Sequence, residues 1–249
     1  MTMIGQRHGS DFTLVSLLLS LLGLGLLPFL LLNPLPNLII PFKLQLIGTA
    51  FAVICILGIL AGIFPTHCSR SGKKKTKAST EESPRNFPST NTSQIQKRGH
   101  HPTCDHYSGH VLRIHTRIFC AGCTGLVSGA GITLIGTVLF FFGNAQFINP
   151  LFIFWLGWFF TAVGLGQHYI YRALHIEHGV VRFLANVLFV VGPFLLLATL
   201  MQFTDSVILG TYLLVLILYW IFTRILMSRR SHIRICAQCG ATNCPLSEV

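Results

Sequence analysis

The sequence predicts an all-α, polytopic membrane protein with about six transmembrane helices and both termini in the cytoplasm. Its 249 residues are 52% hydrophobic and only 10% charged, whereas a soluble globular protein has about 25% charged residues. Six apolar segments are each close to the roughly 20 residues that a helix needs to span a bilayer. The cations, finally, are placed very unevenly between the ends of these segments.

The six predicted spans must be helical, because lipid offers no hydrogen-bond partner to the backbone and segments this long are not tilted barrel strands. The first span could be mistaken for a signal peptide, but its apolar part is too long and no small-residue cleavage site follows, which favours an uncleaved span. The predicted spans are Phe12–Leu32, Leu44–Phe64, Cys120–Phe142, Leu151–Ile170, Phe183–Met201 and Val207–Thr223.

Composition divides the chain into four parts. Residues 1–64 form a two-helix membrane hairpin, rich in leucine and nearly free of ionisable groups. Residues 65–103 are basic and rich in Ser, Thr, Asn and Pro, so they bury too little apolar surface to order themselves and are predicted to be a disordered linker. Residues 104–228 form a four-helix core that carries most of the Cys and His, and residues 229–249 form a basic, Cys-containing tail.

The net charge of +11 comes from cations that gather on one side of the predicted spans. Of the 18 Lys and Arg residues, all but Lys43 fall in segments that share one face. The positive-inside rule places that face and both termini in the cytoplasm, for a protein of the cell membrane. The "KKKTK" run at residues 73–77 would also suit nucleic acid, but attraction to anionic lipid explains it without such a partner.

Cysteines and histidines concentrate around the start of the third span. The stretch "HPTCDHYSGHVLRIHTRIFCAGC" brings together Cys104, a Cys-x-x-Cys pair and several histidines. Cytosolic thiols stay reduced, which favours metal or redox chemistry over a structural disulfide. Zinc prefers four nitrogen or sulfur ligands, and Cys-x-x-Cys provides two from one turn. The predicted ligands are Cys104, Cys120 and Cys123, with His110 or His106 as the fourth.

A second cysteine group, "CAQCGATNC", lies in the tail. Its spacing resembles a zinc knuckle, with Cys236, Cys239 and Cys244 as ligands and His232 as a candidate fourth. Alternatively, Cys236 and Cys239 would join Cys120 and Cys123 in one four-cysteine site, since both groups lie on the same membrane face.

A third polar group occupies "GQHYIYRALHIEHGVVR", between the fourth and fifth spans. Polar residues at the edge of a span are costly and indicate function, although Tyr, His and Arg are also ordinary at a membrane interface. The candidate residues are Gln167, His168, His175 and His178.

The core, about Cys104 to Leu200, resembles a family of small prokaryotic integral membrane proteins known as domain of unknown function 2085. The resemblance rests on an upstream cysteine, Cys104, and on the motif Cys120-Ala-Gly-Cys123-Thr124-Gly125 at the start of a span, followed by Gln167, Arg182 and Gly192. This chain departs from the family pattern at Gly122, where the family usually has Arg, and at Cys104-Asp105-His106, where it often has Cys-His. The resemblance implies a shared membrane core built around three cysteines and no particular activity.

These observations favour a non-enzymatic role, a metal-stabilised membrane module that binds or senses a partner or a metal. Zinc is the predicted metal and iron or an Fe–S cluster the alternative. The rival function is thiol redox or electron transfer by Cys120 and Cys123. Transport ranks third, because the spans offer few polar groups at mid-membrane.

Overall fold

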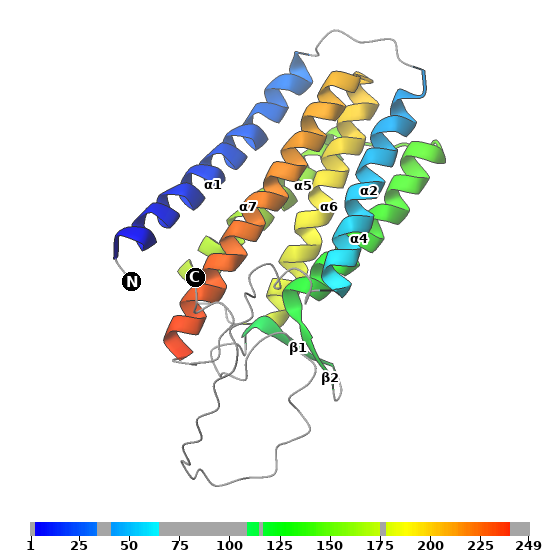
Figure 1. Cartoon of the computed structure of the whole chain (residues 1–249). Helices are drawn as coiled ribbons and strands as arrows, with labels where there is room; N and C mark the ends of the chain where they lie inside the picture. The colour runs from blue at the N-terminus through cyan, green and yellow to red at the C-terminus, as the bar shows by residue number, and fades with distance from the viewer. Residues whose placement is uncertain (1–2, 34–40, 65–108, 115–116, 175–177, 240–249) are drawn as a thin grey trace, which may run out of the picture.

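The computed structural model describes residues 3–33, 41–64, 109–114, 117–174 and 178–239. Its main elements are long helices arranged as one bundle (Figure 1), with a short antiparallel hairpin before the third long helix. In chain order these elements are α1 (Met3–Leu32), α2 (Lys43–Ile63), β1 (Val111–Ile114), β2 (Arg117–Cys120), α4 (Ala121–Thr137) with its π-helical extension η2 (Val138–Phe142), α5 (Pro150–Ala173), α6 (Gly179–Thr204) and α7 (Val207–Cys239).

Six of these helices are long and apolar enough to cross a membrane, which confirms the predicted all-α, multi-pass membrane fold. The predicted spans coincide with the helices except at their ends. The largest difference is in α7, which continues well beyond the predicted Val207–Thr223 to Cys239.

Helix α6 forms the centre of the bundle, packed against α4, α5 and α7. Glycines let the helix backbones approach closely, as is common in membranes. A Cβ at Gly125 of α4 would lie 2.5 Å from the backbone oxygen of Phe183, and one at Gly157 of α5 would lie 2.9 Å from that of Gly192. Both contacts therefore require a residue without a side chain.

The two N-terminal helices are part of this bundle. Helix α1 packs mainly on α7 and α5, whereas α2 packs on α4 (Figure 1). Hydroxyl groups join α1 to α7, because Thr223 Oγ1 lies 2.8 Å from Ser16 Oγ and 2.9 Å from Ser20 Oγ. The indole of Trp220 also donates to the Ser20 carbonyl over 3.1 Å.

Helix α1 continues through Pro28, which changes its hydrogen bonding. A proline has no N–H, so the carbonyl four residues earlier, that of Leu24, loses its usual helical donor. Trp158 of α5 supplies a replacement, since its Nε1–H donates to the Leu24 oxygen over 3.1 Å. The first span thus depends on the fourth for one backbone hydrogen bond.

Two polar contacts hold the connections at the end of the bundle where α6 meets α7. The Gln202 side chain accepts from the N–H of Phe147 and donates to its carbonyl, both over 3.1 Å. Lys43 at the start of α2 forms an ion pair with Asp205, which caps α6.

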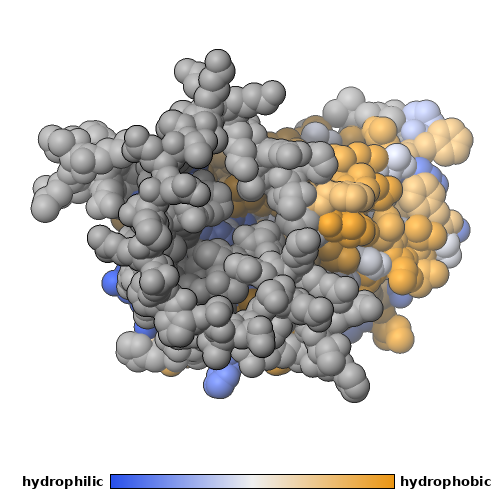
Figure 2. Space-filling model, turned by 60° about the horizontal axis from the view of Figure 1, so that its bottom comes forward, coloured by the Kyte–Doolittle hydropathy of each residue, from blue (hydrophilic) through white to orange (hydrophobic). Residues whose placement is uncertain are grey.

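The opposite end of the bundle is called the cysteine end here. It is where α1, α4 and α6 begin, where α2, α5 and α7 end, and where the hairpin lies (Figure 1). Figure 2 brings this end forward and shows an apolar flank of the bundle beside it. Among the described elements, every Lys and Arg except Lys43 lies towards this end.

Three predictions about the parts outside the spans differ from the structure or concern residues that it does not describe. The predicted linker, residues 65–103, lies outside the described residues. The β1–β2 hairpin was not expected, because the sequence analysis predicted helices and loops but no strands. Residues 229–239 of the predicted tail are helical and continue α7, so Cys236 and Cys239 lie on a helix and not in an open knuckle turn.

Candidate functional site

The Cys-x-x-Cys pair stands at the cysteine end, where β2 passes directly into α4. Cys120 is the last residue of β2 and the N-cap of α4, and Cys123 follows three residues later in the first helical turn. Both thiols are half-buried. The Thr124 hydroxyl donates to the Cys120 carbonyl over 2.8 Å and fixes this turn. The pair therefore projects from a helix N-terminus, where the helix dipole stabilises thiolates.

The hairpin places the backbone of His110 near the cysteine pair. Val111 pairs with Cys120 in the β1–β2 register, so His110 immediately precedes the residue opposite Cys120. The hairpin in turn rests on the first turn of α6, where a Cβ at Gly179 would overlap the backbone oxygen of Val111. Buried His110 is thereby held against the ends of the helices.

Arg224 of α7 points into the bundle beside α5 and α6. Its Nη2 donates to Asn186 Oδ1 over 2.6 Å, and its guanidinium carbon lies 5.1 Å from the centre of the Phe189 ring. The Gln167 amide also faces it, and with its oxygen turned to the guanidinium it accepts from both terminal nitrogens. Gln167 and Asn186 are 3% and 5% exposed, so these are interior contacts of a cation at the edge of the membrane.

Arg182 of α6 lies next to this group. Its Nη1 is 3.2 Å from Nδ1 of His110, and its guanidinium lies 5.2 Å from the centre of the Tyr171 ring. Asn186 links the two arginines, since its amide donates to the Arg182 carbonyl over 2.6 Å while its oxygen accepts from Arg224.

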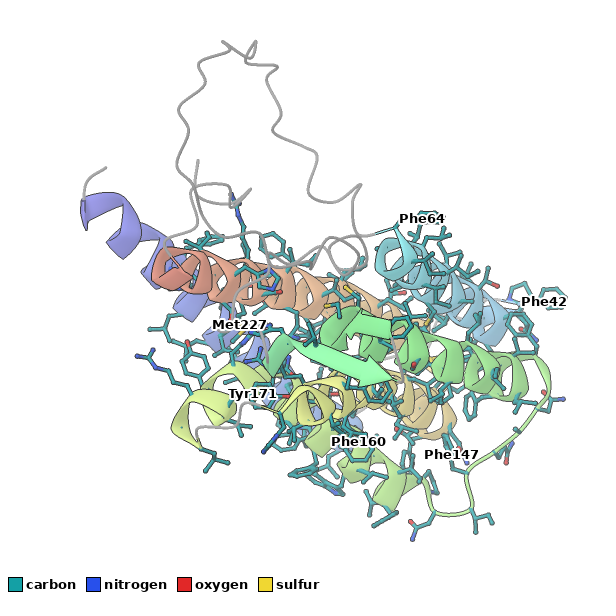
Figure 3. The ribbon with its side chains drawn as sticks, turned by 90° about the horizontal axis from the view of Figure 1, so that it is seen from below. Phe42, Phe64, Phe147, Phe160, Tyr171 and Met227 are labelled. Atoms are coloured by element: carbon teal, nitrogen blue, oxygen red, sulfur yellow. The ribbon has the colours of Figure 1, made fainter. Side chains whose placement is uncertain are left out.

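Tyr171 of α5, labelled in Figure 3, is the last member of this group. Its hydroxyl lies 3.1 Å from the Val181 carbonyl, to which it donates, and 3.3 Å from the end of the Gln167 amide that points away from Arg224. We call the six residues joined by these contacts the arginine cluster: His110, Gln167, Tyr171, Arg182, Asn186 and Arg224.

One candidate ligand of each of two predicted sites lies at the same place. The rings of His110 and His232 lie 5.8 Å apart between centroids. His110 was assigned to the cysteine site before α4, and His232 to a separate site in the tail. The structure therefore brings together these two histidines of the predicted groups.

The third predicted group divides. Gln167 lies in the arginine cluster, and His168 is half-buried beside it in sequence. His178 is exposed at the N-cap of α6. His175 lies outside the described residues.

Metal binding receives no direct geometric support from the described part of the chain, which holds no group of three or more His, Cys, Asp or Glu side chains placed to share an ion. Cys104, His106 and Cys244 lie outside the described residues, and the side chains of Cys236 and Cys239 are not described. The complete predicted ligand sets therefore remain predictions.

Sequence reasoning missed three members of the arginine cluster: Tyr171, Asn186 and Arg224. Asn186 carried a usable signal, because an amide within an apolar span is costly unless it has a partner. Arg224 directly follows the predicted end of the last span, and an arginine at such a position is usually solvated. Its inward direction was therefore not predicted.

No family model matches the chain, and no curated protein or solved structure was found to match it. The resemblance described above thus stays a prediction, and any function has to be argued from the residues themselves.

Proposed function

We propose that this multi-pass membrane protein is a zinc-stabilised binding or sensing module and not an enzyme. In this proposal Cys104, Cys120 and Cys123 bind the metal together with one histidine, so that the metal ties the segment before β1 to the start of α4. The observation that carries the proposal is the position of Cys120 and Cys123, one turn apart at a helix N-terminus. Two thiolates from one turn are half of a tetrahedral zinc shell.

Cys104 is within reach of this pair. It precedes His110 by six residues, and six residues span up to about 20 Å when extended. Since His110 lies next to the residue that pairs with Cys120, a third thiolate from Cys104 needs no movement of the helices.

The fourth ligand is better supplied by His106 than by His110 in the arrangement described. Arginine only donates hydrogen bonds, so Nδ1 of His110 accepts from Arg182. The proton of a neutral imidazole then lies on Nε2, and neither nitrogen has a lone pair left for a metal. His110 would become a ligand only after breaking its contact with Arg182.

Elemental analysis of purified protein tests the proposal. We expect about one zinc per chain in the wild type, and loss of that zinc in Cys120→Ser and Cys123→Ser, because a shell of four ligands loses most of its affinity with one thiolate. Cys55→Ser is the matched control, since Cys55 is buried at mid-membrane, where its sulfur lies 3.4 Å from the Thr133 hydroxyl. A Cys120→Ser protein that keeps its zinc would refute the proposal.

Counting the reactive thiols distinguishes the zinc site from the alternative of thiol redox chemistry. A zinc site predicts that Cys120 and Cys123 react slowly until a chelator is added. A metal-free protein with a reversible two-electron couple at these cysteines would instead support thiol redox or electron transfer. Transport would gain support only if reconstituted flux were lost on replacing His168 or His175.

The same proposal places the cysteine end in the cytoplasm of the cell membrane, where a protein partner would meet it. Its support is the concentration of cations at that end, which follows the positive-inside rule. Labelling of Arg229→Cys in intact cells tests the orientation, in a background from which the other reactive thiols have been removed. Reaction with a membrane-impermeant maleimide before lysis would place this end outside.

A further inference from the structure

Arg224 is a cation without a described counter-ion. Its contacts within the described part of the chain are the two neutral amides of Asn186 and Gln167 and the ring of Phe189. Of the chain's seven Asp and Glu residues, Asp205 is the one whose side chain is described, and it lies at the far end of the bundle, paired with Lys43. Removing one partner of a buried charge pair is strongly destabilising, so an arginine held among neutral groups calls for an anion.

A second cation strengthens this argument. The Asn186 side chain hydrogen-bonds both to the carbonyl of Arg182 and to the guanidinium of Arg224, so the two arginines are neighbours. Arg182 therefore brings a second positive charge to the group that surrounds Arg224. Because Gln167 in this group is only 3% exposed, bulk water screens these charges poorly.

We propose that the arginine cluster binds an oxyanion of the phosphate class, with Arg224 and Arg182 as its charged ligands. Guanidinium groups match phosphate oxygens with paired hydrogen bonds. The Tyr171 hydroxyl lies next to Gln167 and the His110 ring next to Arg182, so both groups stand beside the proposed ligands. This site uses residues other than the cysteines and does not depend on the zinc proposal.

The position of the arginine cluster relative to the membrane allows two sources of phosphate, a soluble ion or a lipid headgroup. Arg224 follows Val207 by 17 residues, which corresponds to about 26 Å of helix, against a hydrocarbon core about 30 Å thick. Arg224 therefore lies within about one helical turn of the edge of the hydrocarbon core, from where a long cationic side chain reaches the headgroup region. The phosphate is either a soluble ion that enters from the cysteine end or the headgroup of an anionic lipid.

Thermal unfolding of the purified protein in a maltoside detergent, which carries no phosphate, distinguishes the two sources. One arm adds inorganic phosphate, with chloride at matched ionic strength as the control. The other arm contains no phosphate salt and adds phosphatidic acid to the micelles. A stabilisation in the first arm identifies a free phosphate, and one in the second identifies a lipid phosphate.

Variants locate the effect. Arg224→Gln should weaken the response to the active anion by about tenfold or more, because it removes charge-assisted hydrogen bonds. Arg229→Gln, on the exposed side of the same helix, should keep the wild-type response. An equal loss in both variants would show that the anion acts on general surface charge and would overturn the proposal.

The variant Gln167→Glu places a carboxylate of the protein itself beside Arg224, in place of a bound anion. The new carboxylate would stand where the amide faces Arg224 and would accept from the Tyr171 hydroxyl. We expect this variant to be stable without phosphate and to lose at least most of the anion-dependent shift. A full wild-type shift in Gln167→Glu, or no shift of the wild type in either arm, would refute the anion site.

Discussion

Gly125→Ala tests how closely α4 approaches α6 beside the cysteine pair. The new Cβ would lie 2.5 Å from the Phe183 backbone oxygen and 2.9 Å from the Asn186 Cβ, whereas ordinary contact begins at 3.4 Å. The helices would therefore have to separate by about 0.9 Å, the difference between 3.4 and 2.5 Å. The obstacle is backbone, so no side chain can rotate away to relieve it.

The magnitude follows from two opposing effects. Alanine is favoured over glycine in a helix by about 1 kcal/mol, while overpacking costs about 1–3 kcal/mol. We expect Gly125→Ala to be destabilised by about 1–2 kcal/mol, since the clash with a fixed carbonyl is at the upper end of that overpacking range. Gly131→Ala is the matched control on the same helix, because its Cβ would meet nothing within 4 Å.

The measurement is unfolding in mixed micelles with increasing sodium dodecyl sulfate, followed by tryptophan fluorescence. The alkylation rate of Cys123 serves as a second readout, and it should rise in Gly125→Ala as α4 moves off α6. Equal stability of Gly125→Ala and Gly131→Ala would show that the interface yields freely and that the close approach does not hold the site.

Three further predictions use the same unfolding assay or thiol reactivity. Trp158→Phe should cost about 1–3 kcal/mol because it leaves the Leu24 carbonyl without a donor, whereas Trp155→Phe, at an exposed position, should change little; equal effects would contradict the role of Trp158. Thr223→Val should cost about 1 kcal/mol, from two hydroxyl contacts at roughly 0.6 kcal/mol each, and an unchanged midpoint would argue against them. Gly179→Ala should displace β1 and speed alkylation of the neighbouring cysteine pair, so an unchanged rate would mean that the hairpin is held elsewhere.

Much of the fold could be predicted because the membrane restricts the choices. Backbone groups in lipid must bond within their own segment, so each long apolar run had to be a helix. The prediction failed at helix ends for the same reason. Hydropathy detects the edge of the hydrocarbon at Thr223, but α7 has no reason to stop there and continues to Cys239.

The site was harder to predict because its contacts join distant parts of the chain. Nothing local indicates that His232 would meet His110, or that Arg224 would turn inwards to Asn186. The spacing of Gly125 and Gly129, four residues apart on one helix face, was a usable signal of close packing. It indicates that the start of α4 packs closely on another helix, and the structure identifies that helix as α6.

The hydrogen bond between Trp158 and the Leu24 carbonyl has a consequence for how the protein is made. Spans enter the membrane in the order of synthesis, and α1 emerges three spans before α5. Until α5 arrives, one carbonyl of α1 faces lipid without a donor, which costs several kcal/mol. The first helix is therefore incomplete as an independent membrane segment, and its final position must be set late in biogenesis, when the indole of Trp158 reaches it.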